Sequence, residues 1–318
     1  MSTPEPLTGG VLVIGSITAD VTTFSQRLPR PGETILGDDL TLVLGGKGAN
    51  QAVAAALAGA ATRMVGCVGT DAFTELTRGG LEALGVDVSA VRIVDGPTGV
   101  AHIRVDASGE NDIVMMPLAN THLAAEHVDA GVAAARGRAS VLLTQLEIPV
   151  DVVVRAARAA RSAGMLTVLD PAPAALLDDS VWALFDVVTP NETEASTITG
   201  LTVDDVASAE RAGRWFVDRG VSHAVITLAA AGAVVVDGAG ARHVLAPSVD
   251  AVDTTAAGDA FAGYLGAGLA DGLSLDDALP RAVAAGALAV TRRGASPSLP
   301  AGADVDAFLA GHPAARHR

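Results

Sequence analysis

Short apolar runs alternate with longer amphipathic segments along most of this 318-residue chain. Runs such as VLVIG at 11–15 and TRMVGCVG at 62–69 are typical of buried strands in a parallel sheet. The Ala-rich segment GANQAVAAALAGA at 48–60 predicts a helix that packs closely on its neighbours. The other strands are predicted at about 140–146, 166–170, 185–189, 223–228, 232–237 and 241–246, and the other helices at about 72–84, 124–136, 150–163, 203–219, 257–270 and 275–292.

This alternation predicts a single α/β domain over residues 1–318, a sandwich built on a mainly parallel sheet. Two segments, at about 16–45 and 91–116, break the alternation. They read as short strands around turns such as RPGET, DGPTG and ASGEN, with too little helix for β-α-β units. We expect them to form a small antiparallel sheet that projects from the body as a lid.

Composition and charge exclude several classes of protein. The net charge of −15 argues against a nucleic acid or an anionic membrane as partner, although a local pocket can still bind an anionic ligand. The single cysteine, Cys67, excludes an intrachain disulfide and lies in an apolar run, which favours a buried, inert thiol. The start MSTPEPLTGG lacks the features of a signal peptide, and no apolar run reaches the ~18 residues of a membrane helix. We therefore expect a soluble cytoplasmic protein.

Several familiar motifs fail when they are tested against the sequence. The P-loop needs Ser or Thr after its lysine, but Gly48 follows Lys47. The dinucleotide pattern G-x-G-x-x-G would need glycine at Gln51, which leaves only weak support for a nicotinamide-dependent dehydrogenase. The seven histidines form no zinc-type spacing, and no G-x-S-x-G elbow is present.

The stretch GGKGAN at 45–50 contains Lys47, the only lysine beside twenty arginines. Glycines let a backbone approach a ligand, and the free N–H groups of a helix start attract oxygen atoms. A lysine is a compact point donor, whereas the planar fork of arginine needs more room. This pattern favours a ligand-binding lysine, with Asn50 as a second polar group; the alternative is a tight turn with a solvated lysine.

The stretch DTTAAGDAFAG at 253–263 combines a turn of small residues with a carboxylate. Backbone N–H groups at Ala256, Ala257 and Gly258 would form a nest for an anion. Asp259 falls in the predicted first helical turn, where the helix dipole stabilises a negative charge. A carboxylate beside an anion nest suits a base that takes a proton from a hydroxyl attacking a phosphoryl group. The alternative is an acidic residue that only stabilises a helix start.

The third stretch, TPNETEA at 189–195, follows a predicted strand. Asn191 and Glu194 could bind Mg²⁺ through water, because Mg²⁺ prefers oxygen ligands. The same pair also has the spacing of a helix capping box, so both interpretations stay open.

Together with GSITAD, TQLEIP, LDPAPA and AVTRRGASPSLP, these stretches resemble the pfkB family of carbohydrate kinases, in order from about residue 11 to 308. The resemblance implies a three-layer α/β/α sandwich whose β lid also forms a homodimer. It implies transfer of the γ-phosphoryl group of ATP to the O5 hydroxyl of D-ribose, with Mg²⁺ and an activating K⁺ ion.

The resemblance also assigns roles to residues of this chain. Asp259 matches the catalytic base, and Ala256, Ala257 and Gly258 match the anion hole. The sugar-binding positions correspond to Thr18, Asp20, Gly46, Lys47, Gly48, Asn50, Glu147 and Asp259. The nucleotide and Mg²⁺ positions correspond to Asn191, Glu194, Thr227, Leu228, Ala229, Ala230, Ala231, Gly232 and Gly258. The K⁺ loops correspond to Asp253, Thr255, Ala289, Arg292, Gly294 and Ser298.

Two positions depart from the family pattern. Thr18 stands where Asn is frequent, so one sugar contact differs, and Val283 stands where a His or Asn near adenine is expected. The alternatives are therefore a kinase for 2-deoxyribose, another sugar or a nucleoside, and, outside the enzymes, a sugar-sensing binding protein. Retention of both Asp259 and the glycine-containing nest favours the kinase.

Overall fold

A nine-stranded sheet forms the centre of the computed structural model, which describes residues 9–312. Its strand order is β13-β12-β11-β10-β9-β8-β1-β4-β5, and all neighbours pair in parallel except β11 with β12 and β12 with β13. The expected α/β class with a mainly parallel sheet is thus confirmed. The strands are β1 (Gly10–Ile14), β4 (Thr62–Val68), β5 (Asp87–Ile93), β8 (Ala139–Gln145), β9 (Leu166–Asp170), β10 (Val187–Val188), β11 (His223–Thr227), β12 (Ala233–Asp237) and β13 (Ala241–Val244).

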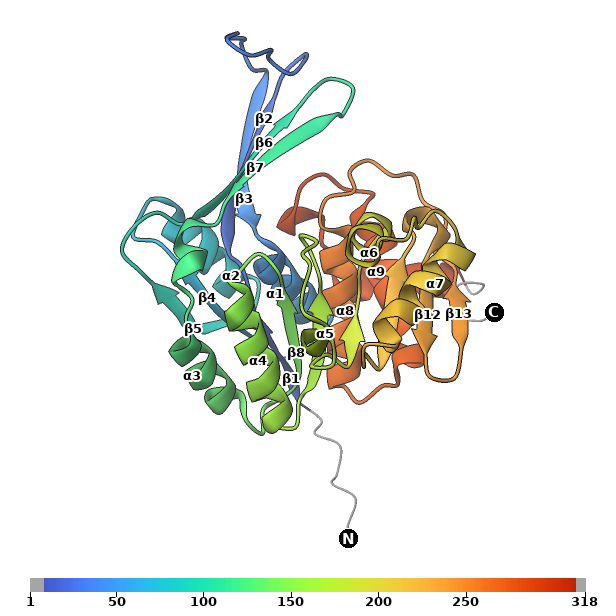
Figure 1. Cartoon of the computed structure of the whole chain (residues 1–318). Coiled ribbons are helices and arrows are strands. Elements are labelled where there is room, and N and C mark those ends of the chain that lie inside the picture. The colour runs from blue at the N-terminus through green and yellow to red at the C-terminus, as the bar shows by residue number, and fades with distance from the viewer. Residues whose placement is uncertain (1–8, 313–318) are drawn as a thin grey trace.

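Helices cover both faces of this sheet and complete the three layers (Figure 1). The central strands β1 and β8 are buried along their whole length, as their apolar runs predict. One face packs against α1 (Lys47–Leu57), α2 (Gly80–Ala83), α8 (Ala257–Ala270), α9 (Leu275–Ala289) and α10 (Gly302–Gly311). The other face packs against α3 (Ala125–Ala135), α4 (Val150–Ser162), α5 (Asp179–Trp182), α6 (Glu192–Thr199) and α7 (Val206–Val217).

A second, four-stranded sheet projects from the body as the lid (Figure 1). It contains β2 (Thr18–Phe24), β3 (Asp39–Gly45), β6 (Gly99–Val105) and β7 (Asn111–Met116) in the order β3-β2-β6-β7. The expectation of an antiparallel lid is wrong in one respect: β2 and β6 pair in parallel, because two hairpins lie side by side.

Other differences from the predicted elements have local causes. The second predicted lid segment begins too early, because residues 91–93 end β5, which pairs with β4 in the main sheet. The helix predicted at 72–84 is a π-helical turn (Glu75–Gly79) continued by α2. The short helices α6 and α10 are absent from the predicted elements, since each buries only two residues and shows little periodicity.

Helices α1 and α8 pack unusually closely, although they are far apart in the sequence. A Cβ atom on Gly263 of α8 would lie 2.4 Å from Ala54 Cβ and 2.7 Å from the carbonyl oxygen of Gln51. Glycine is therefore required for this approach. The contact brings the start of α8 beside the start of α1.

Two other expectations concern residues away from this contact. Cys67 is fully buried, as expected, and burial raises the pKa of its thiol to about 11, which disfavours the reactive thiolate. Within residues 9–312, no helix combines the length and apolar character needed to cross a bilayer. The expectation about a signal peptide rests on residues 1–10. Residues 1–8 of this segment lie outside the described residues.

Candidate active site

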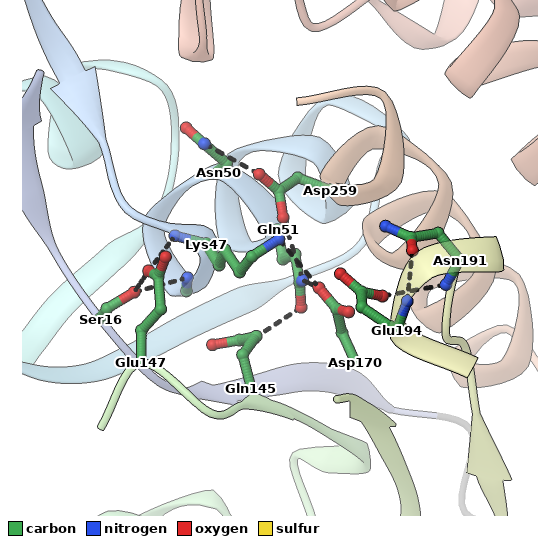
Figure 2. Close-up of polar contacts among 11 residues, drawn as sticks. Ser16, Lys47, Asn50, Gln51, Gln145, Glu147, Asp170, Asn191, Glu194 and Asp259 are labelled. Atoms are coloured by element: carbon green, nitrogen blue, oxygen red, sulfur yellow. Dashed lines mark hydrogen bonds and ion pairs between the residues drawn. The ribbon is translucent and has the colours of Figure 1, made fainter. Parts of the chain in front are cut away.

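Several of the predicted site residues lie near the carboxyl ends of β1, β8 and β9. Figure 1 shows the lid sheet joining the body at this edge. This edge of an open α/β sheet is where ligands generally bind. Figure 2 shows side chains from α1, α8 and the strand ends pointing toward one another. They come from segments that are up to 209 residues apart.

Glu147, which follows β8, caps the start of α1. Gly46 is the N-cap residue, with a φ of 89° and no capping side chain of its own. Glu147 Oε2 instead accepts hydrogen bonds from the backbone N–H of Lys47 (3.1 Å) and from Ser16 Oγ (2.6 Å). A Cβ on Gly48 would lie 2.6 Å from the Ser16 backbone nitrogen, so only glycine fits there. The GGKG sequence is thus needed for close backbone approach.

Asp20 lies at the base of the lid, where its carboxylate rests on the backbone of Gly45. A Cβ on Gly45 would lie 2.1 Å from that carboxylate. Thr18 Oγ1 donates a hydrogen bond to Asp20 Oδ1 (2.8 Å). Burial raises the pKa of the Asp20 carboxyl to about 6, against the effect of Thr18, and the charges of Glu147 and Asp259 raise it further.

We expect Asp20→Asn to stabilise the ligand-free protein at pH 8 by up to about 3 kcal/mol, since two pH units of pKa shift correspond to about that free energy. Because the folded-state pKa is raised, the native carboxyl contributes stability only at low pH and loses it as pH rises through about 6. The gain should therefore shrink by roughly half at pH 5. Urea unfolding at the two pH values measures it; an equal gain at both would contradict the assignment.

Lys47 is only partly solvated. Its ammonium lies 3.7 Å from Asp170 Oδ2, and its side chain is 29% exposed. Burial lowers the pKa of Lys47, but Asp170, Asp259, Glu147 and Glu194 together outweigh that effect and raise it. The ammonium is therefore charged, and it lies among carboxylates from both halves of the chain (Figure 2).

Asp259 is held between two amides of α1. Asn50 Nδ2 donates to Asp259 Oδ2 (2.9 Å), and Gln51 Nε2 donates to Asp259 Oδ1 (3.1 Å). Asp259 is 5% exposed. It is thus fixed in orientation while it faces the same space as Lys47 (Figure 2).

The turn before Asp259 presents backbone donors. Ala256 is the N-cap residue of α8 and has a φ of 59°, a left-handed conformation that is strained for alanine. The N–H groups of Gly258 and Asp259 donate no hydrogen bond to any of the described residues. Nothing lies within 4 Å of a Cβ position on Gly258, so the approach to these donors is open. The geometry is that of an anion site at a helix start.

Asn191 and Glu194 form the capping box of α6. Asn191 Oδ1 accepts from the N–H of Glu194, and Glu194 Oε2 accepts from the N–H of Asn191, each at 2.9 Å. The capping interpretation of TPNETEA is therefore correct for the protein alone. Figure 2 shows the Glu194 side chain beside Asp170, so its second carboxylate oxygen borders the site.

Two further loops carry the remaining predicted residues. The turn at 227–232 joins β11 to β12, with Ala229, Ala230 and Ala231 exposed and Gly232 at a φ of 95°. A bridge between Asn191 and Thr227 places this turn next to α6. Val283, in contrast, is 7% exposed and packs into the core with α8, so its side chain adds no polar group to this edge.

Asp253 forms hydrogen bonds to both loops that are predicted to bind a monovalent cation. Its Oδ1 accepts from the Thr255 backbone N–H (2.9 Å) and hydroxyl (2.6 Å), and its Oδ2 accepts from the Gly294 N–H (2.9 Å). The guanidinium of Arg292 pairs with Asp304 (3.2 Å). Ser298 is buried and donates to the Ala295 carbonyl, and the Ala289 carbonyl accepts from the N–H of Arg292.

Sequence reasoning missed four polar residues of the site: Ser16, Gln51, Gln145 and Asp170. Ser16 follows β1 and Asp170 ends β9, within the segments GSITAD and LDPAPA already singled out. Gln51 lies one residue after GGKGAN. A polar residue at the carboxyl end of an apolar strand was the available signal for three of them.

Comparison with protein families decides which class this geometry belongs to. The family model of the pfkB carbohydrate kinases matches residues 9–302. The chain belongs to the pfkB carbohydrate kinase family. This kinase therefore transfers a phosphoryl group from ATP to a sugar, and the expectation from GGKGAN and DTTAAGD is confirmed at the level of the family.

Two relatives match the sequence of this kinase over more than nine tenths of both chains. It is 40% identical over 298 residues to a ribokinase of Haemophilus influenzae, covering 93% of this chain and 97% of that one. It is 35% identical over 292 residues to a deoxyribokinase of Salmonella typhi, covering 91% and 95%. Its fold matches the structure of Arabidopsis thaliana ribokinase complexed with ribose and ATP, with a TM-score of 0.87 and 30% identity over 95% of this chain and 98% of that chain.

Proposed function

We propose that this kinase is a ribokinase that transfers the γ-phosphoryl group of ATP to the O5 hydroxyl of D-ribose, with Asp259 as general base. One observation carries the proposal: the Asp259 carboxylate is held by Asn50 and Gln51 directly beside the free N–H groups at the start of α8. A base next to an anion site is what attack of a hydroxyl on a phosphoryl group requires.

Each residue has a role that follows from its chemistry. Asp20 and Asn50 offer an acceptor and an amide to the sugar, and Lys47 offers a compact cation between the sugar and the transferred phosphoryl group. The N–H groups of Gly258 and Asp259 stabilise the charge that develops on the phosphoryl oxygens. The exposed part of the turn, Ala229 to Ala231, leaves room for the adenosine part of ATP.

A Mg²⁺ ion fits beside Glu194, because this carboxylate keeps one oxygen outside the capping box and borders Asp170. When bound, the ion neutralises phosphate charge. Among residues 9–312 no cluster of three or more His, Cys, Asp or Glu side chains could bind a metal alone. Glu194 would therefore share the ion with phosphate oxygens and water.

A coupled ADP-release assay over a panel of pentoses, hexoses and nucleosides tests the proposal. We expect the highest kcat/KM with D-ribose; no turnover with any of these acceptors would overturn it. The second candidate is 2-deoxyribose, since Thr18 gives its hydroxyl hydrogen to Asp20 and has no amide to offer a sugar hydroxyl. The relation to a deoxyribokinase points the same way. A higher kcat/KM for 2-deoxyribose would decide for it.

Lys47→Arg should raise the sugar KM at least about tenfold. Gly46 and Gly48 press the start of α1 against residues 16–18, so the slot fits an ammonium but not a planar fork. Steady-state kinetics with the sugar varied measures the effect. Unchanged KM and kcat would mean that the Lys47 side chain does not touch the sugar.

We also propose that a K⁺ ion binds between the loops at 253–255 and 289–298 and stiffens the anion site. Asp253 already connects these loops, which offer backbone and side-chain oxygens. Activity should therefore rise when K⁺ replaces tetramethylammonium at constant ionic strength, measured as initial rate. Equal rates with the two cations would rule the K⁺ site out.

The lid supports a proposal of a homodimer. Leu40, Leu42 and Val114 are 46–58% exposed. The strand register puts all three on one face of the lid sheet, opposite the face that carries Ile113. A second copy of this lid would cover the apolar face, and sedimentation velocity of the wild type and of Leu42→Asp tests this; two monomeric proteins would contradict it.

A further inference from the structure

The side chain of Gln51 lies at the centre of the site, and its contact with Asp259 is only one of its two contacts with carboxylates. It is 1% exposed. Its Nε2 donates to Asp170 Oδ2 (2.8 Å) and to Asp259 Oδ1 (3.1 Å), so one amide group joins two buried carboxylates (Figure 2).

The orientation of this amide is forced. Burial raises the pKa of the Asp170 carboxyl, and the charge of Lys47 acts against this effect. Once ionised, a carboxylate only accepts hydrogen bonds, so the nitrogen of Gln51 faces Asp170 and Asp259. Its Oε1 then faces Gln145, whose Nε2 donates to it at 2.5 Å. Gln145 thereby fixes the amide from the side away from the ligands.

Charged groups surround the pair of carboxylates on every side. Lys47 of α1 lies 3.7 Å from Asp170. Glu147 after β8 and Glu194 of α6 act on Asp170, and Asp20 of β2 interacts with Asp259. Without a donor between them, Asp170 and Asp259 would repel each other and move apart.

We propose that Gln51 is a positioning residue that couples the Lys47–Asp170 ion pair to the catalytic base Asp259, with Asp170 as the anchor of both. Through this link, Lys47, which donates to the sugar, and Asp259, which deprotonates the sugar hydroxyl, keep a fixed position relative to each other. The inference rests on the proposed function, because it assigns a task within that phosphoryl transfer.

Two substitutions of matched size should move the pH dependence of kcat in opposite directions. Gln51→Met removes the donor that favours the ionised carboxylate of Asp259, so the acidic limb should move up by about one pH unit. Asp170→Asn removes a nearby negative charge but still accepts a hydrogen bond from Gln51, so the limb should move down by a similar amount. At optimal pH, kcat should fall about 10–100-fold in Gln51→Met, the effect of one lost hydrogen bond to a charged group.

Gln145→Met serves as the matched control, because it frees the far side of Gln51 and leaves both carboxylate contacts in place. We expect a smaller upward shift than in Gln51→Met. Thermal unfolding of each variant, followed by Trp182 and Trp215 fluorescence, reports folding separately. A purely structural role of Gln51 and Asp170 would lower the unfolding temperature and leave both acidic limbs where the wild type has them.

The outcomes separate this inference from the proposed function. If the wild type is active, opposite shifts of the acidic limb in Gln51→Met and Asp170→Asn support the coupling. Active wild type with unmoved limbs, or limbs that move in the same direction in both variants, overturns the coupling alone. Wild type without phosphoryl transfer to any sugar overturns the proposed function and the coupling together.

Discussion

Asp259→Asn should lower kcat by ~10²–10⁴-fold, the usual contribution of general-base catalysis. This corresponds to about 3–5 kcal/mol of activation free energy at ~1.4 kcal/mol per decade. The amide keeps the size of the carboxylate but cannot take the proton of the attacking hydroxyl. Single-turnover phosphoryl transfer measures the loss.

The fold and the sugar affinity should survive this substitution. Asn50 Oδ1 has no hydrogen-bond partner among the described residues, so a flip of the Asn50 amide offers an acceptor to the amide introduced at position 259. Calorimetry should therefore report a nearly unchanged sugar Kd, since the lost interaction develops in the transition state. A variant within about threefold of the wild-type kcat would remove Asp259 from the role of base.

Gly263→Ala should damage stability and catalysis together. The added Cβ would lie 2.4 Å from Ala54 Cβ, 2.7 Å from the Gln51 carbonyl oxygen and 2.9 Å from the Ala55 nitrogen, so α8 must move away from α1. Overpacking of this kind typically costs about 1–3 kcal/mol. Asp259 lies one turn earlier on the same face of α8, so its contacts with Asn50 and Gln51 lengthen. A displacement of about 1 Å can cost about 10²-fold in rate, and we expect kcat to fall by that order.

Gly311→Ala provides the control for helix propensity. Gly311 ends α10, and nothing lies within 4 Å of its Cβ position. The change should be neutral or slightly stabilising and leave kcat unaltered. Urea unfolding and steady-state kinetics on both variants compare them; equal behaviour would show that the α1–α8 contact tolerates a methyl group.

The body of the fold could be predicted because its strands are short, fully apolar and separated by helices. The run 11–15 agrees with β1 to within one residue at each end, and the segments at 166–170 and 257–270 agree with β9 and α8. Which sheet a strand joins could not be predicted. β5 shows the same polar–apolar alternation as the lid strands, and only its pairing with β4 assigns it to the body.

The site also contains residues that the sequence could predict and residues that it could not. Lys47, Asn50 and Asp259 stand in compact motifs whose residue types already indicate their chemistry. Gln51, Gln145 and Asp170 act through each other across 94 and 119 residues, and no local pattern encodes such a distance. Gln145 and Asp170 end apolar strands and Gln51 follows Asn50, so the sequence marks these positions as polar but does not show which of them meet.

The packing of α1 under α8 also has a consequence during synthesis. At ~5–20 residues per second, a ribosome needs about 10–40 seconds to add the roughly 200 residues between these helices. Throughout that interval the side of α1 that carries Ala54 and Ala55 lacks the helix that covers it. The nascent chain is therefore exposed to aggregation until its last third has emerged, and a chaperone that shields apolar helices would raise the yield of folded protein.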